Sequence, residues 1–184
     1  MNNIKYQENL IRAMDMLAKE SNTIFIGQTI VYGGSPMFNS TKNVPKEKKI
    51  EMPIFEDTQM GISIGLSLEG FIPISIFPRI DFLIIAANQL VNHLDRVEEM
   101  SCGRFKPKVI IRALVGSTKP LYPGSQHCQD HTKALKCLLT NVDVVRLTSA
   151  VRIVPAYRRA LKSERSSILI ELMDLYQWVP PYQK

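Results

Sequence analysis

Residues 52–76, MPIFEDTQMGISIGLSLEGFIPISI, carry the pattern that decides the fold class, because a helix is followed there directly by a strand. Asp57 and Thr58 are good helix N-caps, so we expect a helix over residues 57–70. The β-branched run at 72–76 predicts a buried strand. Gly61 and Gly65 share one face of this helix, which allows tight packing either within the domain or against a second subunit.

The same alternation continues on both sides of this stretch. Apolar periodicity and β-branched runs predict further elements, namely helices over 4–20, 80–100, 130–138 and 150–163, and strands over 23–26, 108–112, 143–147 and 167–171. Residues 28–50 form a predicted loop, and a loop of that length is usually functional or becomes ordered by a partner. The alternation indicates an α/β fold with a central, mostly parallel sheet covered by helices on both faces. We expect one domain over residues 1–178 and a tail over 179–184.

The composition is that of an ordinary globular chain, with 45% hydrophobic and 22% charged residues among 184, which excludes a disordered protein. The net charge of +6 permits nucleic-acid binding, but the basic residues are interspersed with acids, so we expect no nucleic-acid partner. The longest apolar stretch, 82–91, is too short to span a bilayer, and we expect no membrane partner. Three cysteines without a CxxC pair, together with the lack of a visible signal peptide, predict a cytoplasmic protein.

Glu56 is the first candidate for chemistry, because its carboxyl group follows the apolar segment 52–55. This group is either solvated at a helix N-terminus or held dry, where a carboxyl group can do acid–base work. The chain contains no GxxxxGK[ST], GxGxxG or GxSxG signature. If the fold binds a phosphorylated cofactor, another chain must therefore hold the phosphate end.

The densest polar cluster spans residues 126–131 and contains His127 and His131. Four residues apart, the two rings would share one face of a helix. A zinc site is one interpretation, although no second ligand pair at a familiar spacing completes it, and we assign no metal ligand to this chain. The other interpretations are a pair of surface histidines and a loop histidine that reaches a ligand as acid or base. The spacing alone does not decide among them.

Residues 52–74 resemble the pyrimidine-binding domain of thiamine-diphosphate enzymes in the transketolase-like group. The likeness is closest to the β subunit of the 2-oxo acid dehydrogenase decarboxylase component, whose pattern TPISExGxxGxAxGAAxxGxxPI aligns without gaps. Further landmarks follow in the family's order and extend the resemblance over about residues 4–178, namely Phe82, Asn88-Gln89, Ile110-Ile-Arg112 and Gln126-His127.

The resemblance implies roles for five residues. Glu56 falls on the catalytic glutamate that hydrogen-bonds a pyrimidine ring nitrogen and favours the imino tautomer, whose nitrogen removes the thiazolium proton. Phe82 falls on the aromatic residue that stacks on the pyrimidine. Pro78 falls on an apolar contact, and Ile54 on a position that brings backbone groups near the ring. His127 falls on the catalytic histidine that positions the carboxylate of the 2-oxo acid or its intermediates.

The resemblance also implies a cofactor and partners. In this family thiamine diphosphate lies between two chains, and a separate diphosphate-binding subunit holds the diphosphate and its magnesium ion. The implied assembly is an α2β2-type heterotetramer that decarboxylates a 2-oxo acid and transfers the resulting acyl or aldehyde unit. Two alternatives stay open, a non-catalytic scaffold subunit that stabilises a partner and a transketolase-type carbon–carbon ligase subunit.

Two departures from the family pattern bear on these expectations. Gln28 and Thr29 stand where the β subunits have two acids, which puts the family's proton communication between active sites in doubt. The β subunits also continue into a C-terminal domain, whereas this sequence stops after the pyrimidine domain. We therefore expect a stand-alone pyrimidine subunit that works with a separate chain.

Overall fold

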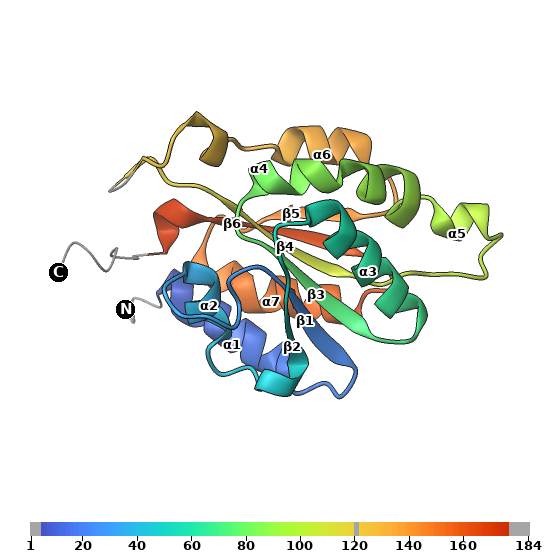
Figure 1. Cartoon of the computed structure of the whole chain (residues 1–184), viewed down its shortest axis with the longest axis horizontal. Coiled ribbons are helices and arrows are strands. Elements are labelled where there is room, and N and C mark those ends of the chain that lie inside the picture. Colours follow the sequence, from blue (N-terminus) through green and yellow to red (C-terminus); the bar gives the residue numbers. More distant parts are fainter. Residues whose placement is uncertain (1–4, 120–121, 177–184) are drawn as a thin grey trace.

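The chain forms a six-stranded sheet in which each strand is parallel to its neighbours, in the order β2-β1-β3-β4-β6-β5 (Figure 1). The computed structural model describes residues 5–119 and 122–176, so the predicted tail at 179–184 lies outside the described residues. The strands are Thr23–Gly27 (β1), Lys49–Glu51 (β2), Ile72–Phe77 (β3), Ile110–Val115 (β4), Asp143–Arg146 (β5) and Ser167–Leu172 (β6). The predicted α/β fold with a parallel central sheet is therefore confirmed.

Helices cover both faces of this sheet (Figure 1). One face carries Tyr6–Ala18 (α1), Pro36–Thr41 (α2) and Ala150–Lys162 (α7). The other face carries Glu56–Leu68 (α3), Ile80–Leu83 (α4) and Thr132–Leu138 (α6), with Val97–Met100 (α5) farther out. Single turns of other helical types are Lys46–Lys48 (η1), Ile84–Ala86 (η2), Gln89–Leu94 (η3), Ser125–His127 (η4) and Met173–Leu175 (η5). Among the described residues, no helix is both long enough and apolar enough to cross a membrane.

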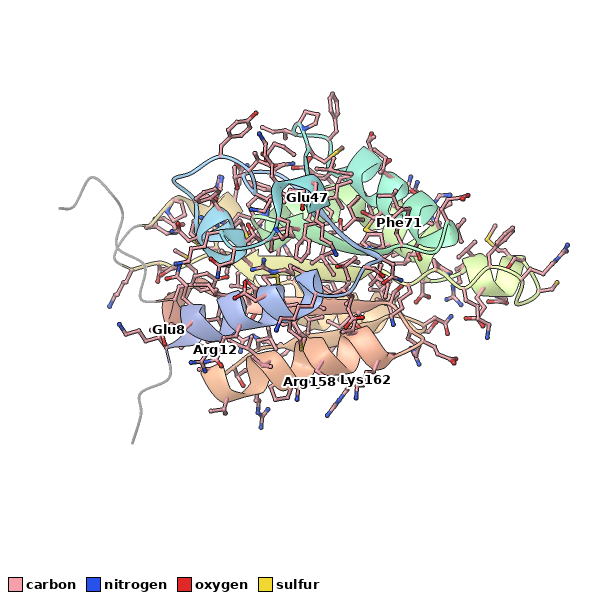
Figure 2. All side chains as sticks on the ribbon, turned by 90° about the horizontal axis from the view of Figure 1, so that it is seen from below. Glu8, Arg12, Glu47, Phe71, Arg158 and Lys162 are labelled. Carbon is pink, nitrogen blue, oxygen red and sulfur yellow. The ribbon has the colours of Figure 1, made fainter. Side chains whose placement is uncertain are left out.

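Amphipathic helices account for the two apolar cores. Leu17 of α1 and Tyr157 of α7 are fully buried against one face of the sheet, and Met60 of α3 is fully buried against the other. Figure 2 shows α1 and α7 side by side, with Arg158 and Lys162 of α7 directed away from the sheet. Burial of one apolar stripe per helix, with the charged stripe in solvent, is what fixes these helices on the sheet.

The segment predicted as a loop, residues 28–50, contains α2, η1 and the first two residues of β2, so that prediction is wrong in part. β2 has only three residues, Lys-Ile-Glu, and no apolar run, so its sequence gives no strand signal. It exists because it pairs in parallel with β1, with Phe25 opposite Lys49. Ser35 caps α2, since its hydroxyl group accepts a hydrogen bond from the N–H of Phe38 at 3.0 Å.

The single helix predicted over residues 80–100 is interrupted and runs through α4, η2, η3 and α5. η3 is a wide turn, in which the N–H of Asp95 donates to the carbonyl of Leu90, five residues back, at 3.0 Å. Asp95 is buried after this turn and accepts hydrogen bonds from the N–H groups of Thr140 at 2.9 Å and Asn141 at 2.6 Å. This long-range anchor fixes the end of the helix, and apolar periodicity does not reveal it.

The order of the strands has a switch point at the carboxyl edge of the sheet, where open parallel sheets form a crevice. The connection that follows β1 leads to β2 on one side, whereas the connection that follows β3 leads to β4 on the other side. Ligands of open parallel sheets bind outside the carboxyl ends of the strands at such a switch point. Residues that follow β1, β3 and β4 are therefore the candidates for a functional site.

Candidate functional site

The predicted site residues come from three segments at this edge. Ile54 lies between β2 and α3, and Glu56 begins α3. Pro78 and Phe82 follow β3, and His127 ends η4 in the segment after β4. β2, β3 and β4 belong to one parallel sheet, with only β1 between β2 and β3, so the segments that follow them lie along the same edge. The location agrees with the switch point, which follows from strand order alone.

Glu56 is the first residue of α3 and is only 4% exposed. Of the two environments that the sequence allowed, the structure shows the buried one. The side-chain amide of Gln28, itself 7% exposed, donates a hydrogen bond from Nε2 to Oε1 of Glu56 at 3.2 Å. A carboxyl group at a helix N-terminus is further favoured by the helix dipole. The arrangement holds one carboxyl oxygen in a fixed position inside the crevice.

The chain directly after Gln28 is held by a carboxylate that sequence reasoning missed. Glu51, at the end of β2, accepts hydrogen bonds from the N–H groups of Thr29 at 2.5 Å, Ile30 at 2.9 Å and Val31 at 2.8 Å. Thr29 has a φ of 56°, a conformation that a β-branched residue rarely adopts. The three hydrogen bonds from consecutive N–H groups offset that strain and fix the chain directly after Gln28.

Phe82 and His127 are in direct contact. Their ring centroids lie 5.4 Å apart at an interplanar angle of 85°, an edge-to-face pair. Both side chains are half-buried, and His127 has a buried Nδ1 without a hydrogen-bond partner among the described residues. Two residues that the sequence placed 45 positions apart therefore form one surface of the crevice.

A glycine and an aspartate fix the His127 segment. A Cβ atom at Gly116, directly after β4, would lie 1.8 Å from the carbonyl oxygen of His127, so only glycine fits there. Asp81 accepts hydrogen bonds at Oδ1 from the backbone N–H of Gln129 at 3.3 Å and from its Nε2 at 3.1 Å. Neither residue carries a sequence signal for this role, because each contact joins segments that meet only in the folded chain.

His131 does not share a helical face with His127. His127 ends η4, whereas His131 precedes the first residue of α6. Within residues 5–119 and 122–176, no group of three His, Cys, Asp or Glu side chains is arranged to hold a metal ion. The shared-face geometry considered for a zinc pair is therefore not found.

The remaining two predicted contacts lie at the rim. Pro78 is half-buried directly after β3, and the side chain of Ile54 is 78% exposed. Their roles toward a ligand stay predictions. A cavity of about 320 Å³ lies elsewhere, between β5 and α7, and none of the predicted site residues lines it.

Curated proteins similar to the chain carry one recurring name. The chain is 25% identical over 168 residues to a pyruvate dehydrogenase E1 component subunit beta of Cyanidium caldarium, covering 87% of this chain and 49% of that protein. It is 27% identical over 176 residues to the chloroplastic subunit beta-3 of the same component from Oryza sativa subsp. japonica, covering 92% and 43%. The chain thus spans about half the length of the curated relatives it matches. No family model matches it.

Two of the solved structures similar to the chain are transketolases. A split-gene transketolase described as an inactive beta4 tetramer matches with a TM-score of 0.71 and 20% identity, over 92% of this chain and 51% of that one. A transketolase from Campylobacter jejuni subsp. jejuni matches with a TM-score of 0.70 and 18% identity, over 93% and 26%. At these identities the likeness establishes a shared fold.

Proposed function

We propose that this chain, which is a transketolase-like pyrimidine-binding domain, is the pyrimidine-binding subunit of a heteromeric thiamine-diphosphate-dependent enzyme. The proposed reaction is decarboxylation of a 2-oxo acid, followed by transfer of the acyl or aldehyde unit. The observation that carries the proposal is the buried carboxyl group of Glu56, held by Gln28 at the switch point of the sheet. Fold likeness alone would not assign chemistry to the chain.

The residues at this edge suit an aminopyrimidine ring. Glu56 offers a dry carboxyl group to a ring nitrogen, and only its Oε1 has a hydrogen-bond partner among the described residues. Phe82 offers a half-buried aromatic ring, with Pro78 and the backbone near Ile54 as the further proposed contacts. When bound, thiamine diphosphate supplies the electron sink that decarboxylation of a 2-oxo acid needs.

Glu56 acts on a proton at the ring nitrogen that it contacts. Gln28 occupies Oε1, so Oε2 is the oxygen left to share this proton. The low dielectric of the buried crevice strengthens the hydrogen bond. His127 acts on the substrate, since its half-buried ring is oriented by Phe82 and keeps one nitrogen free for a carboxylate.

The proposed partner is a separate subunit that holds the diphosphate and the magnesium ion, in an α2β2-type heterotetramer. The curated relatives are themselves named as subunits of a larger component. The surface formed by α3, the turn after it and η2 also exposes large apolar side chains, namely Ile62, Leu68, Phe71, Ile84 and Ile85. Exposed apolar patches of this kind mark interaction surfaces.

Carbon–carbon ligation of the transketolase type is the second candidate, favoured by the two solved structures described above. A non-catalytic scaffold is the third, and the joint presence of Glu56, Phe82 and His127 argues against it. Three free cysteines support the proposal of a reducing, cytoplasmic location.

The test is Glu56→Gln in the complex reconstituted with the diphosphate-binding subunit. Glutamine keeps the size and can still hydrogen-bond, but it cannot pass a proton, so turnover should fall about 10²–10⁴-fold. Exchange of the thiazolium proton, followed by NMR, should slow as well. Glu8→Gln, exposed in the first turn of α1 on the opposite face of the sheet, is the matched control and should keep both rates. Wild-type turnover in the Glu56→Gln complex would refute the proposal.

A further inference from the structure

Buried polar side-chain atoms without a partner gather at one place in the fold. Among the described residues four such atoms occur, and three of them lie between the end of β3 and η4, namely Arg79 Nε, Asp81 Oδ2 and His127 Nδ1. Buried polar atoms are nearly always hydrogen-bonded, because an unpaired one destabilises the fold. The unpaired nitrogens of Arg79 and His127 therefore indicate a polar ligand.

Contacts between the two segments join the three residues. Asp81 accepts two hydrogen bonds from Gln129, which lies two positions after His127. Arg79 lies two positions before Asp81, and its charge acts on both Asp81 and Cys128, the neighbour of His127. The unpaired atoms thus lie on two segments that contact each other, the end of β3 with α4 and the segment after β4.

Arg79 is the unusual residue among these three. Its Nη1 donates to the carbonyl of Pro78 at 2.7 Å, but among the described residues no carboxylate lies within ion-pair distance of it. Arg112, by contrast, donates from Nε and Nη2 to both carboxylate oxygens of Glu171, at 2.7 and 2.9 Å. Burial lowers the pKa of Arg79, as expected for a guanidinium group without such a partner.

We infer that Arg79 is a specificity residue that joins His127, whose carboxylate role the family resemblance already implies, in binding the substrate carboxylate, and that Arg79 selects 2-oxo acids over uncharged carbonyl compounds. This inference rests on the proposed function. The guanidinium fork matches a carboxylate in geometry and charge, and its Nε–H is free. His127 supplies a second donor when Nδ1 carries a proton. Asp81, fixed by Gln129, repels a carboxylate and so turns it toward Arg79.

The position of Arg79 suits the reaction. Arg79 follows β3, which lies between β1, followed by Gln28, and β4, which leads to the His127 segment. A carboxylate held at Arg79 therefore lies on the His127 side of the crevice, and the adjacent carbonyl carbon can face the side where Glu56 is buried. The carboxylate subsite and the proposed pyrimidine contact occupy neighbouring strand ends.

The test uses the full chain, whose only histidines are His93, His127 and His131, so that each imidazole C–H signal can be followed by NMR. Titration with oxamate, an unreactive carboxylate, should shift the His127 signal saturably, whereas its uncharged ester, ethyl oxamate, should not. Arg79→Gln should weaken oxamate binding about 10–100-fold, the scale of a lost charged hydrogen bond. Arg79→Lys should recover part of the loss, and Arg104→Gln, which is exposed, should change nothing.

Two results would overturn this role of Arg79, namely equal shifts with oxamate and its ester, and wild-type affinity in a folded Arg79→Gln chain. Thermal unfolding checks the fold of each variant. The comparison of acid and ester in the wild-type chain decides the question even where a variant does not fold. The titration needs neither a partner nor turnover, so its failure is distinct from failure of the proposed function, which Glu56→Gln tests.

Discussion

Gln28 determines the surroundings of Glu56. The family pattern has an acid at this position, and this chain has an amide that donates a hydrogen bond to Glu56 at 3.2 Å. An acid there would bring two carboxyl groups together in a buried crevice, and like charges at such a distance force one of them to keep a proton. The amide replaces that repulsion with a donor–acceptor pair.

We expect Gln28→Glu to make the stability of the chain depend on pH. The introduced carboxyl group should have a folded-state pKa above its unfolded value of about 4.3. It should therefore not destabilise the fold below that pH, and its destabilising effect should grow as the pH rises. Urea unfolding should show about 1–3 kcal/mol less stability than the wild type at pH 7, and little difference at pH 4. Gln28→Ala loses the same hydrogen bond without adding charge, so its loss should be equal at both pH values.

The sequence predicted the residues that the chemistry would need, but not those that hold them. Glu56, Phe82 and His127 were found because their order and spacing match a family pattern, and their roles stay predictions. Glu51 was not found, since its carboxylate reaches the N–H groups after Gln28 only once β1 and β2 have paired. Arg79 was not found because an unpaired buried atom is a property of the folded chain.

At the scale of an element, the two glycines of α3 have different surroundings, although they lie four residues apart on one face of the helix. A Cβ atom at Gly61 would lie 3.7 Å from the side chain of Gln89, an ordinary contact with η3. A Cβ atom at Gly65 would meet nothing within 4 Å. Tight packing inside the domain therefore explains neither glycine. At Gly65 the subunit contact is the interpretation that the structure leaves open.

We expect substitutions at Gly65 to separate folding from assembly. Gly65→Ala should stabilise the chain by about 1 kcal/mol, because alanine is the better helix former and space is available. Gly65→Arg should fold as well, but it should weaken association with the diphosphate-binding subunit, since a long charged side chain would enter the interface. Urea unfolding and sedimentation of the mixed subunits measure the two effects. Unchanged association of Gly65→Arg would place this face of α3 outside the interface.

Most strands could be predicted from the sequence, whereas β2 and the interruption of the helix at η3 could not. β1, β3, β4, β5 and β6 lie close to their predicted bounds, because apolar β-branched runs between loops and helices identify buried strands. β2 was missed because its pairing with β1, rather than its own residues, makes it a strand. The interruption at η3 was missed because a wide turn keeps nearly the same apolar spacing as a regular helix.

At the scale of the whole molecule, one buried polar network joins the sheet to the helices of one face. Arg112 of β4 donates to both carboxylate oxygens of Glu171 on β6, and also to the hydroxyl of Ser40 on α2 at 3.0 Å. The hydroxyl groups of Tyr157 on α7 and Tyr176 donate to the same carboxylate. All of these side chains are fully buried. Each charge is therefore compensated, and loss of one ionic partner costs about 3–5 kcal/mol.

This network makes the fold sensitive to alkali. Burial raises the pKa of Tyr157 and Tyr176, and the charge of Glu171 raises both further. Tyrosines in the unfolded chain therefore ionise first, near pH 10. The stabilisation is complete below that pH and is lost as the pH rises above it, by about 1.4 kcal/mol per pH unit for each tyrosine that stays neutral in the fold.

Tyr157→Phe tests whether the network causes this decline. At pH 8 the variant should be about 1.5–3 kcal/mol less stable than the wild type, because Glu171 loses a hydrogen bond. Above pH 10 its stability should fall less steeply, because the variant has one fewer tyrosine that ionises in the unfolded chain but stays neutral in the fold. Urea unfolding between pH 8 and pH 11 measures both effects, with Tyr122→Phe, exposed and outside the network, as the control that keeps the wild-type slope. If Tyr157→Phe keeps that slope too, the alkaline loss arises outside the network, and the assignment of the decline to these buried tyrosines is wrong.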